Sequence, residues 1–167
     1  SFPRRCLYSG SNVVHNCLAV QLLLAEVAPR RPDVAFVIHG SCALPFQNAC
    51  KLKNVFFDPD FARFRDYTAP GFVGLNTVTT GAGSNLKLLQ YLCHGMPVMS
   101  TPFGMRGFED LITYVSLVEP AQIPDMIDQV MRPPVPPQVL EAYQWSTIAS
   151  GMLDSYRRIL AGRQGAA

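Results

Sequence analysis

The sequence predicts an α/β fold: a single doubly wound (Rossmann-like) domain with about six parallel strands. Short apolar runs alternate along the chain with segments of helical periodicity, the pattern of a parallel sheet with crossover helices. The length of 167 residues and a hydrophobic content of 49% are sufficient for one sizeable core. Since no apolar run approaches the roughly 20 residues that a membrane helix needs, we expect no membrane span.

The first half of the chain begins with a strand and a long helix. The apolar run from Cys6 to Ser9 ends at Gly10, and Ser11 or Asn12 is the expected N-cap of a helix that reaches about Ala28. Apolar residues recur in this helix at steps of three and four, so one face is expected to be buried. The other expected elements of this half are strands at 34–39, 54–57 and 72–76 and a short helix at 61–67.

In the second half, a glycine-bearing turn leads into a helix from Ser84 to His94, with Gly95 as its C-cap. The proline-rich segment 132–137 fits neither a helix nor a central strand, so we expect a stiff surface connector. All elements are assigned to one domain, residues 1–167. The remaining ones are strands at 96–100 and 115–118, a short helix between them, a helix at about 121–131 and a last helix at about 139–160, which Trp145 is expected to anchor by packing.

Charge and residue counts narrow the class of partner. The net charge of +2 is too small to predict a nucleic acid ligand. The charged fraction of 16%, against about 25% in ordinary domains, implies neutral or apolar surface that another partner could cover. Five cysteines without a C-x-x-C pair indicate free thiols in a reducing compartment, so we expect a cytoplasmic protein. The three histidines lack metal-ligand spacing, and we expect neither a metal nor another cofactor.

Two turns stand where doubly wound sheets bind ligands, after strands that feed helices. The first contains Gly10, Ser11 and Asn12; with one glycine it is a weak nucleotide fingerprint, and a plain tight turn with a helix cap is the simpler interpretation. The second is Gly81-Ala82-Gly83-Ser84-Asn85. Its glycines allow close backbone approach, and the helix after it offers free N–H groups to a phosphate. The alternative is that these glycines only shape the turn.

The helix after the second turn carries a polar stripe. Lys87, Gln90 and His94 are spaced i, i+3, i+7, so they share one side of an otherwise apolar helix. Such a stripe faces either solvent or a cleft. In a cleft, Lys87 would meet an anion bound at the helix start and Gln90 a neighbouring hydroxyl group, whereas His94 is too distant. His39 ends an apolar strand and is expected to be a core or strand-end histidine.

The run from Asn76 to Gly107, N-T-V-T-T-G-A-G-S-N-L-K-L-L-Q-Y-L-C-H-G-M-P-V-M-S-T-P-F-G-M-R-G, strongly resembles the donor-binding segment of GT-B fold glycosyltransferases of the group 1 type. In that family a glycine-rich turn, a helix with K-x-x-E and the phrase G-x-P-V-V-S-T-P-x-G-x-R-G occur in this order. The resemblance extends upstream through Y-S-G-S-N and A-P-R-R-P-D-V-A-F-V-I-H-G and downstream to the last helix, so it covers almost the whole chain.

The resemblance implies that the chain is the C-terminal half of a GT-B architecture and binds a nucleoside-diphosphate sugar. The glycine turn would meet the diphosphate through backbone N–H groups, and the ribose-binding position maps onto Gln90. Sugar transfer, retaining at the anomeric carbon, would use an acceptor and any general base from an N-terminal domain, so this chain alone is expected to bind without catalysing. No catalytic residue is assigned. The implied donor contacts are Gly10, Ser11, Asn12, Gly81, Ala82, Gly83, Ser84, Asn85, Lys87 and Gln90.

The sequence also departs from the family pattern. Two glutamates that many members carry, separated by seven residues, map onto Ala82 and Gln90, so both carboxylates are absent. The stretch that often supplies a phosphate-binding arginine and lysine holds Ser11, Asn12, His15 and Asn16 instead. The alternative hypothesis is therefore a non-catalytic interaction domain derived from the GT-B fold. An unrelated α/β enzyme, such as a reductase or phosphatase, would need a full G-x-G-x-x-G, a Walker turn or a nucleophilic cysteine loop, which the sequence lacks.

Overall fold

The fold is described from a computed structural model in which residues 2–82, 85–130 and 135–164 are placed. The chain divides into two compact units, residues 1–134 and 135–167. The first unit holds the sheet and the second consists of helices, and each is described by itself.

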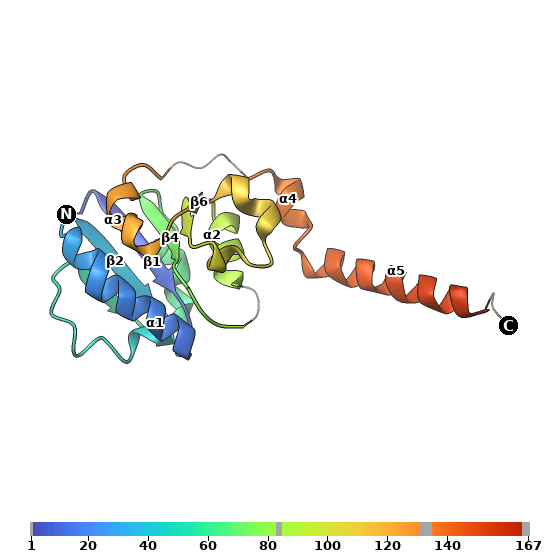
Figure 1. The fold of residues 1–167 in the computed structure, drawn as a ribbon, viewed down its shortest axis with the longest axis horizontal. Coiled ribbons are helices and arrows are strands. Elements are labelled where there is room, and N and C mark those ends of the chain that lie inside the picture. Colours follow the sequence, from blue (N-terminus) through green and yellow to red (C-terminus); the bar gives the residue numbers. More distant parts are fainter. Residues whose placement is uncertain (1, 83–84, 131–134, 165–167) are drawn as a thin grey trace. The chain divides into compact units, whose positions relative to one another are not determined.

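The described part of the first unit contains one sheet of six parallel strands in the order β3-β2-β1-β4-β5-β6 (Figure 1). This arrangement confirms the predicted doubly wound fold. After β3 the chain returns to the opposite side of β1, so the loops that follow β1 and β4 diverge and leave a crevice at their carboxyl ends. The strands are β1 (Arg4–Ser9), β2 (Val34–His39), β3 (Val55–Asp58), β4 (Phe72–Asn76), β5 (Val98–Ser100) and β6 (Ser116–Leu117).

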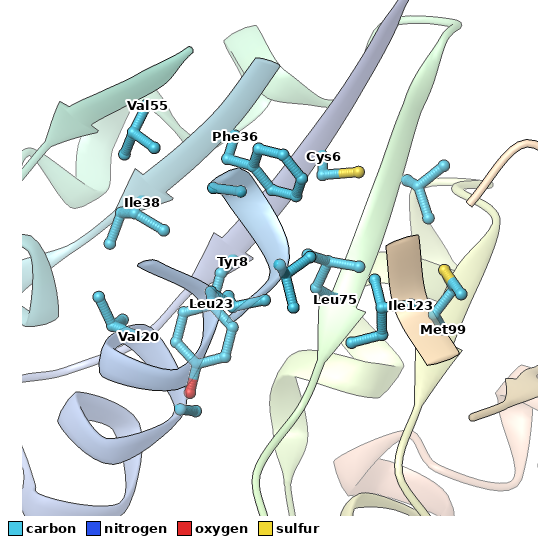
Figure 2. Close-up of a cluster of buried hydrophobic side chains, with 14 of the residues drawn as sticks. Cys6, Tyr8, Val20, Leu23, Phe36, Ile38, Val55, Leu75, Met99 and Ile123 are labelled. Carbon is cyan, nitrogen blue, oxygen red and sulfur yellow. The ribbon is translucent and has the colours of Figure 1, made fainter. Parts of the chain in front are cut away.

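Helices cover both faces of the sheet. On one face α1 (Val14–Leu22), which continues as irregular helical turns to Arg30, and α3 (Ile123–Met126) enclose the main core. Figure 2 shows Val20, Leu23 and Ile123 of these helical segments packed beside strand residues such as Tyr8 and Leu75. On the other face α2 (Leu86–Cys93) approaches β4 closely, because a Cβ at Gly74 would lie 2.6 Å from the Tyr91 ring.

Three sequence expectations about helix ends need correction. Val13, rather than Ser11 or Asn12, is the N-cap of α1, because the Asn12 N–H donates to Ser41 Oγ at 2.8 Å and the Ser11 carbonyl accepts from Asn16 Nδ2 at 3.0 Å. The helix expected at 121–131 is a 3₁₀ turn at 120–122 followed by the short α3. His94 is the C-cap of α2, and Gly95, at φ +70°, follows it in the left-handed conformation.

The second unit holds α4 (Pro137–Glu141) and α5 (Trp145–Gln164), so the single last helix expected at about 139–160 is wrong. The N–H groups of Tyr143 and Gln144 bond to carbonyls three residues back, which tightens the chain and ends α4 without a glycine or proline. Of the expected connector 132–137, residues 132–134 lie outside the described part and Pro137 begins α4.

The side chains of α5 are open within the second unit. Trp145 is 80% exposed, so the described residues of this unit do not provide the packing that the sequence predicts for it. Ile148, Met152, Tyr156 and Ile159 are exposed on the same helix. None of the described helices is both long and apolar enough to cross a membrane.

Candidate functional site

A pocket of about 240 Å³ opens at the carboxyl ends of β1 and β4, where the chain topology places a ligand crevice. It brings together five of the sequence-predicted donor contacts: Gly10, Ser11, Asn85, Lys87 and Gln90. Five further lining residues were not among the predicted donor contacts: Ser9, His15, Asn16, Phe61 and Leu86.

Lys87 is the only cationic side chain of Lys or Arg type that lines this pocket in the described structure. Its Nζ donates to Asn16 Oδ1 at 2.6 Å and to Tyr8 Oη at 2.9 Å, and it lies 4.2 Å from the centre of the Tyr8 ring. No carboxylate among the described residues forms an ion pair with it. Burial lowers the pKa of Lys87 to about 8. A partly buried ammonium group without a counter-charge favours the binding of an anion.

Tyr8 and Asn16 hold Lys87 in this position. The Tyr8 hydroxyl donates to Asn16 Oδ1 at 2.9 Å, so that oxygen accepts bonds from both Tyr8 and Lys87. Burial raises the pKa of Tyr8 well above its ordinary value, so its hydroxyl stays neutral and does not neutralise the lysine. A Cβ at Gly10 would lie 2.8 Å from the Asn16 side chain, so glycine leaves the space that Asn16 occupies.

The turn after β4 is braced by the loop after β5. Gly81 has a φ of +121°, which L side chains rarely adopt, and a Cβ there would lie 2.9 Å from His15 Cγ. Arg106 Nη2 donates to the Gly81 carbonyl at 3.0 Å, and Asn76 Nδ2 donates to the Gly104 carbonyl at 2.9 Å. Asn85, which lines the pocket, also donates from Nδ2 to the Gly104 carbonyl at 3.4 Å, so these bonds connect the turn and the start of α2 to the loop after β5.

The helix that follows this turn begins at the pocket. Asn85 is the N-cap of α2, and its side chain makes no capping hydrogen bond, so Asn85 leaves the first N–H groups of the helix available to another acceptor. Gln90 is exposed and lines the pocket, whereas His94 lines a different one, as the spacing of the stripe predicts.

Of the other five expected donor contacts, three are described, and none of these three lines the pocket. Asn12 and Ala82 do not line it, and both are exposed. Gly83 and Ser84 lie outside the described residues. Gly81 does not line the pocket either, although it lies against His15, which does.

A cluster of aromatic rings packs behind Phe61, the one member of the cluster that lines the pocket in the described structure. Phe61 follows β3 and lines the pocket, and its ring centre lies 5.6 Å from that of His39. His39 is fully buried, as predicted for a core residue, and its Nδ1 lies 2.9 Å from Ser9 Oγ. Burial lowers the pKa of His39, so the imidazole is neutral at neutral pH. Within the described part of the chain, no group of three or more acidic, histidine or cysteine side chains could hold a metal ion.

Comparison with known proteins identifies the fold. No family model and no curated protein matches the sequence. Solved structures do match: the C-terminal domain of a group 1 glycosyltransferase, LpcC from Francisella tularensis, has 15% identity and a TM-score of 0.52 over 77% of this chain and 76% of that one. TarM has 19% identity and a TM-score of 0.54, and the apo-form glycosyltransferase GlyE of Streptococcus pneumoniae has 14% and 0.51.

The chain therefore has the fold of a group 1 glycosyltransferase C-terminal domain, the GT-B arrangement that the sequence motifs predict. The match covers 76% of the LpcC domain. For TarM it covers 78% of this chain but only 28% of TarM, and for GlyE it covers 77% of this chain but only 32% of GlyE. The chain thus corresponds to about a third of each of those two longer chains.

Proposed function

We propose that this chain is the donor-binding half of a glycosyltransferase and holds a nucleoside-diphosphate sugar in the pocket between the ends of β1 and β4. The diphosphate lies against Lys87 and the start of α2, and the ribose lies near Gln90. The sugar acceptor and any general base come from a further domain of the same protein, so the chain alone binds its donor without transferring the sugar.

One observation carries this proposal: the Lys87 ammonium lies in a pocket at the topological switch point without a carboxylate partner among the described residues. Tyr8 and Asn16 give the Lys87 ammonium hydrogen bonds but no negative charge to offset its desolvation. A diphosphate supplies the missing negative charge, and the N–H groups that begin α2 add a positive dipole end. In the transfer step the same groups stabilise the charge that develops on the leaving nucleoside diphosphate, without a metal ion.

The proposed reaction transfers the sugar with retention at the anomeric carbon, as the resembling family does. A cytoplasmic location belongs to the same proposal: all five cysteines are free thiols, which suits a reducing compartment.

The test is calorimetric titration of the purified chain with UDP, GDP and ADP. Saturable binding of at least one of them, weakened by Lys87→Met, supports the proposal. Lys51→Met is the matched control, because it removes the same charge from an exposed position that does not line the pocket. Absence of binding for all three nucleotides contradicts the proposal and favours the non-catalytic interaction domain.

A further inference from the structure

The pocket that holds Lys87 also presents an open aromatic ring. Phe61 begins the 3₁₀ helix after β3 and is 50% exposed, although it lines the pocket together with Gly10 and Lys87. No other phenyl, phenol or indole ring lines the pocket in the described structure. A half-exposed aromatic side chain in the wall of a pocket offers a flat apolar contact to a ligand that binds there.

The surrounding residues hold the Phe61 ring in place. It meets His39 edge-to-face at an interplanar angle of 88°, and His39 is itself packed against Phe64 and Tyr67 at ring distances of 5.7 and 5.4 Å. Gly40 has a φ of +86°, and a Cβ there would lie 2.5 Å from the Phe61 ring. Because the ring is packed on this side before any ligand arrives, contact with its open side costs little conformational entropy.

Two glycines place this ring next to the anion-binding group. A Cβ at Gly40 would also lie 2.6 Å from the Gly10 carbonyl oxygen, and a Cβ at Gly10 would meet Asn16, the partner of Lys87. Gly10 is therefore close both to Gly40, which the Phe61 ring covers, and to Asn16 of the Lys87 cluster. A ligand that satisfies both sides combines a negatively charged group with a flat ring, joined by a linker that passes over Gly10.

We propose that Phe61 is the stacking platform for the nucleobase of the bound donor. The assignment rests on the proposed function and deepens it by naming the residue that contacts the base. Stacking on a phenyl ring accepts every base because each has a π-face, and a purine covers more of the ring than a pyrimidine. Phe61 therefore adds affinity to all nucleotides and ranks ADP and GDP above UDP.

The experiment compares ligands with and without a base. Dissociation constants for ADP, UDP and inorganic pyrophosphate are measured by calorimetry on the wild-type chain and on Phe61→Leu, which keeps an apolar side chain against His39. We expect Phe61→Leu to weaken ADP binding by about tenfold, UDP binding by less, and pyrophosphate binding not at all. Phe56→Leu is the matched control: Phe56 is 47% exposed on β3 but does not line the pocket, and all three constants should stay unchanged.

The outcomes distinguish a failure of the Phe61 assignment from a failure of the proposed binding site. If Phe61→Leu weakens the binding of ADP and of pyrophosphate equally, the platform is overturned, because Phe61 then only maintains the shape of the pocket. Unchanged ADP binding by Phe61→Leu also overturns the platform. In that case Phe61→Trp, which enlarges the ring, should not tighten ADP binding either. If the wild-type chain binds pyrophosphate as tightly as ADP, the platform is wrong while the anion site stands. If it binds neither, the proposed function itself fails.

Discussion

Lys87→Met should abolish most of the affinity for a nucleoside diphosphate while leaving the fold intact. Methionine keeps the length and apolar stem of the side chain but removes the ammonium group. A unit charge about 4 Å away contributes at most about 4 kcal/mol at an effective dielectric constant of about 20. A hydrogen bond to a charged group contributes about 1.5–3 kcal/mol net. We therefore expect a loss of about 2 kcal/mol, which is about 30-fold in the dissociation constant.

The same substitution should not destabilise the fold. It removes a desolvated charge, and the 2.9 Å bond from the Tyr8 hydroxyl to Asn16 Oδ1 still satisfies both remaining groups. The free energy of unfolding, measured by urea denaturation, should therefore stay within about 1 kcal/mol of wild type or rise. A variant that loses several kcal/mol of stability and keeps its nucleotide affinity would show that Lys87 is a structural residue, and the reasoning would be refuted.

Three further predictions follow from the same site. Because the pKa of Lys87 is about 8, nucleotide affinity should fall by about tenfold between pH 7 and pH 9, and calorimetry on Lys87→Met should show no such fall. Gln90→Glu should tighten binding of a nucleoside diphosphate several-fold, since a carboxylate accepts a ribose hydroxyl more strongly than an amide; unchanged affinity contradicts the ribose assignment. Since burial lowers the pKa of His39, the unfolded chain binds more protons below about pH 6.5, so the urea midpoint should drop from pH 7.5 to pH 5.5. His39→Gln should lose that part of the pH dependence, and an equal drop in both proteins rules out His39 as its source.

The sequence predicted the elements of the sheet unit well because its signals are local. The apolar run at 34–39 and the one at 72–76 became β2 and β4 with the expected bounds, and Gly95 adopts the left-handed conformation that follows a helix end. The break between α4 and α5 was missed because residues 142–144 carry no glycine or proline to mark it.

The candidate site was only half predictable from the sequence. Gly10 and Lys87 follow from turn chemistry and helix spacing, which act over a few residues. Tyr8, Asn16 and Phe61 were missed because their roles depend on contacts with residues far away in the chain: Tyr8 and Asn16 meet Lys87 across more than 70 positions. The position of Phe61 just after β3 could have pointed to it, since parallel strands end at one edge of the sheet.

Mapping of amide chemical shifts by NMR tests the central claim most directly, because it locates a bound nucleotide by residue. On titration of the isotope-labelled chain with ADP, the account predicts saturable shifts of the backbone amides of Gly10, Asn16, Phe61 and Lys87, which line the pocket, and none at Lys51. Shifts confined to other parts of the chain, or no shifts at saturating ADP, would contradict a nucleotide site at the ends of β1 and β4.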